Sequence, residues 1–505
     1  LGGHSLKATI VVGKIYKEVG ANVSLTKLFE NYTIKRLAEY IESLNESEYK
    51  PISKVEKKYM YAASSAQKRM YINNCINREN KSYNIPIVFS LLGELNINKV
   101  EEILKEIISR HEILRTHFEV IDGEVVQIIN EEFMFSLEHY EVNERELMDE
   151  IDKFVRPFIL NKAPLIRVAV MRINKLKHIL CFDIHHIISD GFSMRIILSE
   201  FMLLYNNKQL SDIKIQYKDY SEWERKFQET SKYLKEKEYW ISKLKDEDLS
   251  SIGDKLIDYP RTERGNSKGK IQQVIISEEL TRKLKQISIK THTTINSILL
   301  TVYNILIWKY TKEPKIIIGS PVSGRVHSDL YNVVGMFINM ITFKNSIFEN
   351  YTFRTLLQEV NYDSLRSLDN QTYQFDELVR ELGVKSSLIR NPIFDIAFAF
   401  QNIDNIDLKF DDLDVEILNY EENSMQFDLF LNAYEEKNKI VLNFEYLISL
   451  FMDETIKKMS ERYLYILEKA IENLDIVMKD ITFQKEVEYV KVIVNAKELD
   501  EEFIF

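Results

Sequence analysis

The sequence predicts a mixed α/β (α+β) fold with two related layers. Short apolar runs of strand type alternate with amphipathic segments of helical period, and their order is similar in both halves of the chain. The 505 residues are 45% hydrophobic, which is enough for a large core. The chain has only 14 glycines and 8 prolines, which excludes collagen-like and linker-like proteins.

The predicted strands are apolar, rich in β-branched and aromatic residues, and bounded by turn residues. They are expected at 85–92, 125–129, 165–171, 178–184, 315–319, 396–401 and 414–418, with a hairpin at 429–446. Helices are expected at 97–109, 193–205, 221–244, 278–290, 295–309, 352–365 and 453–473. The long, charged segment 221–244 is interpreted as a helix that bridges two lobes.

Residues 1–44 are expected to form a small helical unit, in which Thr33 is suited to cap a helix. These 44 residues are few for an independent core, so we expect that a preceding helix is missing. The chain begins with Leu1 rather than methionine, which suggests a piece of a longer protein. The polar segment 45–58 around Pro51 is expected to be an exposed linker.

Charge and composition argue against several classes of protein. The net charge is −11 and no basic run is present, so no nucleic-acid partner is expected. Cys75 and Cys181 are the only cysteines, which rules out a disulfide framework and fits a reducing cytoplasm. No run approaches ~18 apolar residues and no signal peptide is recognisable, so we expect a cytoplasmic protein without a membrane partner.

The first segment with chemical potential is Leu-Gly-Gly-His-Ser-Leu-Lys-Ala at residues 1–8. Two glycines give a tight turn, and Ser5 then stands at the start of a helix. A helix N-terminus favours an attached phosphate, but a serine there is also an ordinary N-cap. The residues alone leave both interpretations open.

The second segment is His185-His186-Ile-Ile-Ser-Asp190-Gly191, between an apolar strand and an amphipathic helix. Successive residues at a strand end point in opposite directions, so only one histidine can face a given cleft. A general base and a satisfied structural histidine are equally consistent with this pattern. Asp190 is placed either to orient the ring or to pair with a cation. The other seven histidines supply no close pair, so no metal site is expected, and a serine hydrolase is disfavoured because Gly-x-Ser-x-Gly is absent.

Several polar clusters lie in apolar surroundings, and each alone is typical of a cap, a turn or a surface ion pair. If Arg115 is buried, it needs a carboxylate partner. The clusters are at 64–69, 110–116, 217–223, 335–339, 370–373 and 390–392.

Together these segments resemble a known family. The segment around Ser5 is similar to the prosthetic-group attachment site of a peptidyl carrier domain from a nonribosomal peptide synthetase. His185-His186-Ile-Ile-Ser-Asp190-Gly191 resembles the HHxxxDG motif of condensation domains. The polar clusters fall in order on the remaining condensation motifs, from Ser64-x-Ala-Gln-x-Arg-Met to Arg390-Asn-Pro392.

The resemblance implies a domain organisation. Residues 1–44 are a partial carrier domain without its first helix, and 45–58 are a linker. A condensation domain follows, with two lobes similar to chloramphenicol acetyltransferase in a V, at 59–232 and 233–480. The segment 481–505 leads toward a downstream adenylation domain.

The resemblance also implies an activity, that of an amide-forming acyltransferase. Ser5 carries covalent 4′-phosphopantetheine, which a phosphopantetheinyl transferase attaches. The amine of an aminoacyl group on an acceptor carrier attacks the thioester on the donor carrier and forms a peptide bond. Because the carrier precedes the condensation domain, Ser5 is expected to deliver the donor. The two amino acids, and amide against ester formation, stay open.

Implied roles follow for the histidine motif. An α-amine has an unperturbed pKa of ~7.7–8.0, so a strong base is not required. His186 is expected to accept the proton, to hold the amine in line, or both. His185 is expected to be structural.

The supporting residues implied by the resemblance lie in the same motifs. Asp190 is expected to pair with Arg325 from the second lobe, and Gly191 to leave room for the pantetheine arm. Asn339 is expected to be a tunnel contact, and Arg115 a structural residue.

Two alternatives remain. An epimerization domain shares the fold and the double histidine, but Gln67, the Arg110-His-Glu segment and His4 before Ser5 favour condensation of an L-configured donor. A non-catalytic recruitment platform usually has a broken histidine motif, and this motif is intact. A cyclization domain is disfavoured because it has aspartates in place of both histidines.

Overall fold

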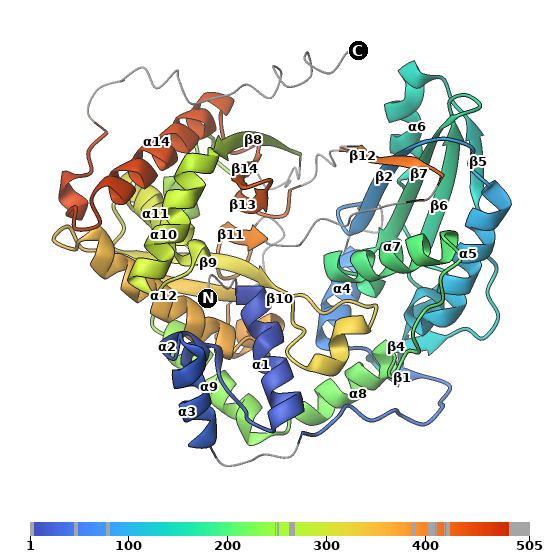
Figure 1. Ribbon diagram of the computed structural model, residues 1–505, viewed down its shortest axis with the longest axis horizontal. Helices are drawn as coiled ribbons and strands as arrows, with labels where there is room; N and C mark the ends of the chain where they lie inside the picture. Colours follow the sequence, from blue (N-terminus) through green and yellow to red (C-terminus); the bar gives the residue numbers. More distant parts are fainter. Residues whose placement is uncertain are drawn as a thin grey trace.

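The chain folds into two α/β lobes with a small helical unit against them (Figure 1). The structure is a computed structural model. It describes residues 5–483 except 45–48, 77–80, 248, 250–251, 262–267, 385–389, 402–409, 411, 419 and 421–424.

The first lobe contains a five-stranded sheet in the order β12-β2-β7-β6-β5. Its strands are β2 (Asn84–Leu92), β5 (Glu138–Glu141), β6 (Ile166–Arg172), β7 (Lys177–His185) and β12 (Asp414–Leu418). A smaller sheet has the order β1-β4-β3, from β1 (Tyr61–Ala62), β3 (Thr116–Ile121) and β4 (Glu124–Ile129). The helices of this lobe are α4 (Ser65–Ile76), α5 (Ile97–Arg110), α6 (Leu147–Phe154), α7 (Gly191–Tyr205) and α8 (Tyr217–Phe227).

The second lobe contains a six-stranded sheet in the order β10-β9-β11-β13-β14-β8. Its strands are β8 (Gly269–Ile276), β9 (Lys315–Val322), β10 (Asn339–Ser346), β11 (Ile396–Gln401), β13 (Leu429–Glu436) and β14 (Lys439–Leu447). Its helices are α9 (Ser231–Leu244), α10 (Glu278–Thr291), α11 (Ile295–Thr311), α12 (Phe353–Asp369), α13 (Phe375–Glu381) and α14 (Asp453–Glu472). The predicted hairpin is present as β13 and β14.

The expected single helix at 221–244 is wrong, because two helices occupy this region. α8 ends at Phe227, and the side chain of Thr230 caps α9 by accepting from the backbone N–H of Tyr233. A threonine N-cap competes with helix continuation, which explains the break. The pair still spans both lobes, because Tyr217 of α8 belongs to the core of the first lobe and Trp240 of α9 to the core of the second.

Two segments of the second half of the sequence return to the first lobe. β12 forms its edge strand by pairing antiparallel with β2. Leu330, Val333 and Phe337, from the connection between β9 and β10, are buried in its core. The lobes are therefore joined by crossing segments of chain as well as by packing, and the double-histidine segment lies near one of these crossings.

The N-terminal helical unit consists of α1 (Ser5–Val19), α2 (Leu25–Glu30) and α3 (Ile34–Glu42). Its apolar contact with the second lobe is made by Ala8 and Leu25 against Leu365 of α12. The expectation of an exposed linker after this unit is wrong at Ile52, which is buried in the first core with its backbone N–H on Asp329 (3.1 Å). The sequence did not reveal the burial of Ile52, because the residues around it are mostly polar.

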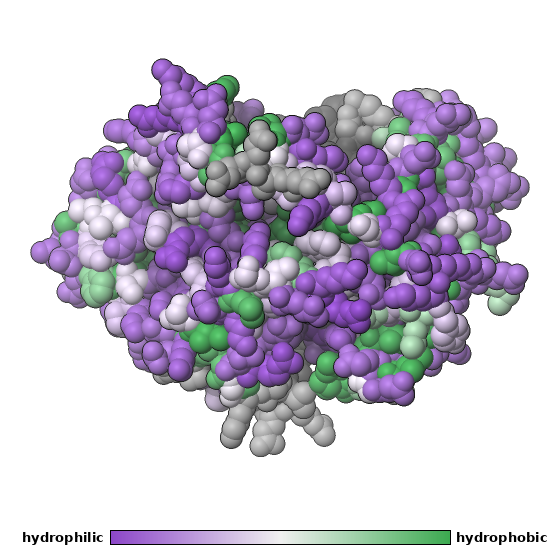
Figure 2. All heavy atoms as spheres, turned by 90° about the horizontal axis from the view of Figure 1, so that it is seen from below, coloured by the Kyte–Doolittle hydropathy of each residue, from purple (hydrophilic) through white to green (hydrophobic). Residues whose placement is uncertain are grey.

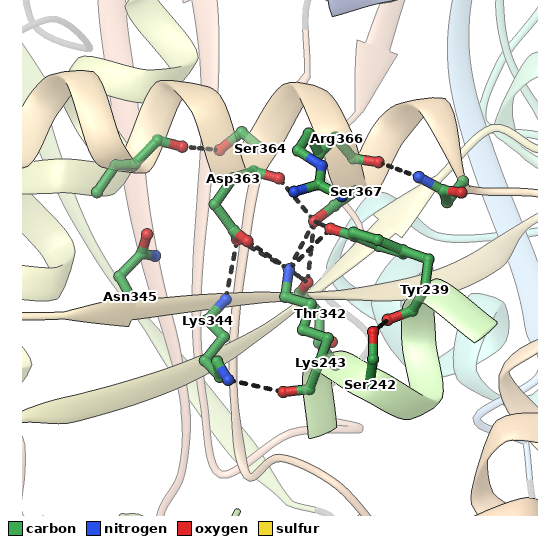
Figure 3. A network of polar contacts seen from close by, with 12 residues as sticks. Tyr239, Ser242, Lys243, Thr342, Lys344, Asn345, Asp363, Ser364, Arg366 and Ser367 are labelled. Atoms are coloured by element: carbon green, nitrogen blue, oxygen red, sulfur yellow. Dashed lines mark hydrogen bonds and ion pairs between the residues drawn. The ribbon is translucent and has the colours of Figure 1, made fainter. Parts of the chain in front are cut away.

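α12 is fixed to its own lobe by a buried polar network (Figure 3). The Lys243 ammonium of α9 donates to the Asp363 carboxylate (2.9 Å), the Ser367 hydroxyl (2.8 Å) and the Thr342 carbonyl (3.0 Å). The backbone N–H of Lys344 also donates to Asp363 (3.0 Å). The network therefore ties α12, which carries the N-terminal unit, to α9 and β10.

The surface seen from below is mostly hydrophilic, with scattered apolar side chains (Figure 2). Over the part of the chain that the structure describes, no helix combines the length and apolar character needed to cross a membrane.

Candidate functional site

The double-histidine segment forms a tight turn between a sheet and a helix. β7 ends at His185, a short 3-10 helix (η3, His186–Ile188) follows, and Asp190 is the N-cap of α7. Of residues 181–190, only His186 is not fully buried. Local geometry therefore presents one histidine and encloses the other.

The imidazole of His186 is oriented by the backbone. Its Nδ1 lies 2.8 Å from the carbonyl oxygen of Ser189, which can only accept, so Nδ1 carries the proton. Nε2 of the neutral ring is then a free acceptor. Burial lowers the pKa of His186, while the charge of Asp190 partly opposes this shift. The ring is therefore neutral near pH 7 and has the tautomer that a general base needs.

His185 is enclosed by its strand and by aromatic rings. Its Nδ1 accepts from the backbone N–H of Ile187 (3.0 Å), and the ring of Phe158 lies edge-on at 5.9 Å. Burial lowers the pKa of His185 to about 3, so this ring stays neutral in the folded protein. It acts as a local cap that shapes the turn, and its side chain is only 1% exposed.

Asp190 holds the turn by capping α7. Its Oδ1 accepts from the backbone N–H and the hydroxyl of Ser193, both at 2.7 Å. The Nη2 atom of Arg325 lies 3.1 Å from Oδ1, and the backbone N–H of Phe337 donates to Oδ2 (3.3 Å). The sequence left two roles open for Asp190. In the structure it pairs with the cation Arg325, and the His186 ring is bonded to the Ser189 carbonyl instead.

Arg325 joins the two lobes at this point. It follows β9 of the six-stranded sheet, and its Nη1 donates to the carbonyl oxygens of Leu330 and Val333, each at 2.6 Å. The Phe337 ring lies 4.0 Å from the guanidinium carbon. Arg325 and Asp190 are both at most 2% exposed, so the pair is buried and well coordinated, as a stable buried ion pair requires.

The remaining predicted residues have distinct environments. An added Cβ on Gly191 meets no atom within 4 Å among the described residues, so packing alone does not require glycine there. Asn339 is buried and bonds backbone only: its Nδ2 donates to the carbonyls of Gln371 (2.9 Å) and Tyr373 (2.8 Å). It thus fixes the loop between α12 and α13.

Arg115 and Ser5 do not belong to the histidine turn. Arg115 is half-buried, so the condition for a carboxylate partner is not met, and its Nη1 donates to the carbonyl of Asn130 (2.5 Å). Ser5 opens α1, and its side chain and the preceding Gly-Gly-His lie outside what the structure describes.

Two residues of α4 support the turn, although sequence reasoning gave them no role. Gln67 donates from Nε2 to the carbonyl of Ile187 (3.3 Å), inside η3. Arg69 donates from Nη2 to the carbonyl of Ile338 (3.0 Å), next to the segment that Asp190 holds. The signal was the polar run at 64–69 in apolar surroundings, which alone is indistinguishable from a helix cap.

The fold and this buried, lobe-bridging histidine turn are those of a condensation-type domain. The condensation domain family model matches residues 57–493, and the phosphopantetheine attachment site model matches residues 1–41. The chain belongs to the condensation domain family. The predicted carrier piece with its attachment site for 4′-phosphopantetheine and the predicted amide-forming condensation domain are confirmed.

The chain is similar to segments of very large bacterial synthetases. It is 40% identical over 475 residues to bacitracin synthase 3 of Bacillus licheniformis, which covers 94% of this chain and 7% of the relative. It is 36% identical over 491 residues to gramicidin S synthase 2 of Brevibacillus brevis, which covers 97% of this chain and 11% of the relative. The chain therefore spans about a tenth of the length of these relatives.

Solved structures confirm the predicted fold. A four-domain nonribosomal peptide synthetase, holo-AB3403 bound to AMP and glycine, superposes with a TM-score of 0.77 at 21% identity, covering 86% of this chain and 34% of the other. The X-domain from teicoplanin biosynthesis gives a TM-score of 0.78 at 18% identity, covering 86% of this chain and 100% of the other. At these identities the likeness concerns the fold alone.

Proposed function

We propose that this chain forms a peptide bond between a donor delivered from Ser5 and an aminoacyl amine on an acceptor carrier, with His186 as the catalytic residue. The observation that carries the proposal is the free Nε2 of His186, at the one position of the 181–190 turn that is not fully buried.

His186 is suited to take a proton as the amine nitrogen attacks the thioester carbonyl. The C–N bond forms, the C–S bond breaks, and the proton lost by nitrogen passes to Nε2 and then to the departing thiolate. The Ser189 carbonyl holds Nδ1–H in place, so the lone pair keeps one direction. His185 and Asp190 fix the backbone on either side, which adds positioning without touching the reacting atoms.

The residues present at the start of α1 fit the attached group. Ser5 is the first residue of a 15-residue helix with no acidic side chain in its first turn, so the helix end favours a phosphate. When bound, the group supplies a thiol that carries the donor as a thioester. Contacts of the N-terminal unit with α12 and with Tyr331, whose hydroxyl donates to the Thr9 carbonyl (3.2 Å), support delivery from this unit.

The proposal extends to partners and location. A separate acceptor carrier, a phosphopantetheinyl transferase and adjacent adenylation domains would complete the system, and the composition fits the cytoplasm. The lobe limits 59–232 and 233–480 are proposed as sequence limits. In space, β12 and the buried residues Leu330, Val333 and Phe337 are added to the first lobe.

The test loads Ser5 with an aminoacyl-pantetheine and supplies a loaded acceptor carrier. His186→Ala is expected to lower the rate of dipeptide formation by ~10²–10⁴-fold, because general base catalysis and positioning are both removed. His139→Ala, at an exposed position of β5, is the matched control and should keep the wild-type rate. An unchanged rate in His186→Ala contradicts the proposal, and exchange of the donor α-proton without dipeptide indicates epimerization.

A further inference from the structure

Helix α4 packs against the histidine turn and contacts it both directly and through Tyr83. It packs against η3, and Gln67 bonds the Ile187 carbonyl. Farther along, Asn73 donates to the Tyr83 hydroxyl (2.9 Å), and the Tyr83 carbonyl accepts from the backbone N–H of His186 (2.7 Å). α4 therefore supports the turn directly at Ile187, and the backbone of His186 through Tyr83.

Arg69 extends from this helix to the other lobe. Its Nη2 donates to the carbonyl of Ile338 (3.0 Å), which immediately precedes β10. Its Nη1 lies 3.4 Å from the carboxylate of Asp376 in α13. The side chain is 12% exposed, whereas the partner carboxylate is 45% exposed. A long cation is thus held nearly buried across the lobe junction.

The position of Ile338 makes this contact specific to the site. Phe337 donates its backbone N–H to Asp190, and Asn339 bonds the loop before α13. Arg69 and Asp190 therefore hold the neighbouring residues Ile338 and Phe337 of one crossing segment.

We propose that Arg69 is a positioning residue that latches the second lobe to the helix beside His186 and keeps a positive charge on this helix, which packs against η3. This inference rests on the proposed role of His186. The latch keeps the lobes in register around the turn, and the charge keeps the imidazole neutral and ready to accept a proton.

The electrostatic surroundings of His186 agree with this role. Burial lowers the pKa of His186, and the positive charge of Arg69 adds a smaller effect in the same direction. Burial raises the pKa of Tyr83, and the charge of Arg69 partly opposes that rise. From α7, Asp190 raises the pKa of His186, and from β7 the neighbouring His185 is neutral. On the far side of Arg69, Asp376 partly offsets the cation.

The experiment titrates His186 and measures the rate in matched variants. In Arg69→Gln, loss of the charge is expected to move the pKa of the His186 imidazole, and the acid limb of the rate profile, upward by roughly 0.5–1 unit. Arg69→Lys keeps the charge and should leave the pKa near that of the wild type while the rate falls. Asp376→Asn frees the cation and should move the pKa downward.

Lys68→Gln is the matched control. It removes a positive charge from the adjacent residue of the same helix, where Lys68 pairs with the exposed Glu124. It should change neither the pKa of His186 nor the rate. Imidazole titration by NMR of the phosphopantetheinylated chain requires no turnover, so it separates this inference from the proposed function. An unshifted His186 in both Arg69→Gln and Asp376→Asn overturns the inference. A shifted His186 in an enzyme whose His186→Ala variant keeps full activity overturns the proposed function instead.

Discussion

Two carboxylates in this chain cap helices and lie at boundaries between units, but they differ in what they hold across the boundary. Asp190 caps α7, is 1% exposed and holds Arg325 from the other lobe. Asp369 of α12 is half-buried and accepts from the backbone N–H groups of Leu25 (2.6 Å) and Thr26 (3.2 Å) in the N-terminal unit.

The two carboxylates differ in whether the helix keeps another N-terminal cap when the contact is lost. Asp190 is the only N-cap of α7, so its loss leaves a buried helix end and a buried guanidinium. α2 has its own N-cap in Ser24, whose hydroxyl accepts from the Lys27 N–H (3.2 Å). Asp369 is therefore an additional cap that can be released without unfolding the carrier helix. We therefore expect the lobe junction to stay closed and the carrier contact to open.

The largest expected effect comes from breaking the lobe junction. Arg325→Met leaves Asp190 buried without its cation, which should destabilise the protein by roughly 3–5 kcal/mol. Dipeptide formation should be lost, because the turn that carries His186 loses its anchor. Denaturant unfolding and rate measurements check both effects.

The double variant Asp190→Asn with Arg325→Met is the control for this prediction. It removes the uncompensated charge and should recover part of the stability but not the activity. Equal stability of Arg325→Met and the wild type would remove the distinction between the two joints.

An intermediate loss of stability is expected on removing Lys243, which holds α12 beneath the N-terminal unit. Lys243 is 9% exposed and burial lowers its pKa, yet it keeps three acceptors from β10 and α12. Lys243→Met leaves Asp363 mainly with the Lys344 N–H, so stability should fall by about 3 kcal/mol.

This variant also tests how the two joints are connected. α12 should lose its fixed position, so the amide protons of α2 should exchange faster although no residue of α2 is changed. Exposed Lys285→Met, which removes a surface pair with Glu435, is the comparison and should lower stability by less than about 1 kcal/mol. Unchanged exchange in α2 would show that its docking does not depend on this network.

The sequence predicted β2 and β7, which lead to or flank the histidine turn, more accurately than β10 of the other lobe. β2 and β7 are apolar runs, and their predicted limits at 85–92 and 178–184 differ from the structure by only a residue or two. β10 was missed because its buried residues include Asn339, Thr342 and Asn345, which break the apolar pattern. Asn339 and Asn345 are satisfied by tertiary hydrogen bonds, which a single sequence does not display.

The local elements of the candidate site could be predicted from the sequence, but the long-range contacts that hold them together could not. The histidine turn is local, so its strand, turn and helix follow from one short segment. The pairing of β12 with β2, and the contact between Arg69 and Ile338, join residues about 270 or more positions apart. These contacts depend on how two lobes cross, for which periodicity and capping patterns contain no information.

The smallest expected effect concerns the carrier contact itself. Asp369→Ala removes the acceptor of two backbone N–H groups and of the Thr26 hydroxyl (2.6 Å). A capping side chain contributes about 0.5–2 kcal/mol, so the docked population should fall by roughly 2–30-fold while α2 stays helical. NMR relaxation of residues 5–44 checks this, because a released unit tumbles faster than the two lobes. Asp369→Asn keeps one acceptor oxygen and should give an intermediate value.

Ser24→Ala gives the opposite pattern and completes the comparison. It removes the cap that belongs to α2 and should fray the helix while Asp369 still holds Leu25 and Thr26. If Asp369→Ala instead melts α2 while Ser24→Ala does not, Asp369 is the principal cap of this helix. The carrier contact would then resemble the joint at Asp190, and release of the carrier would require its helix to unfold.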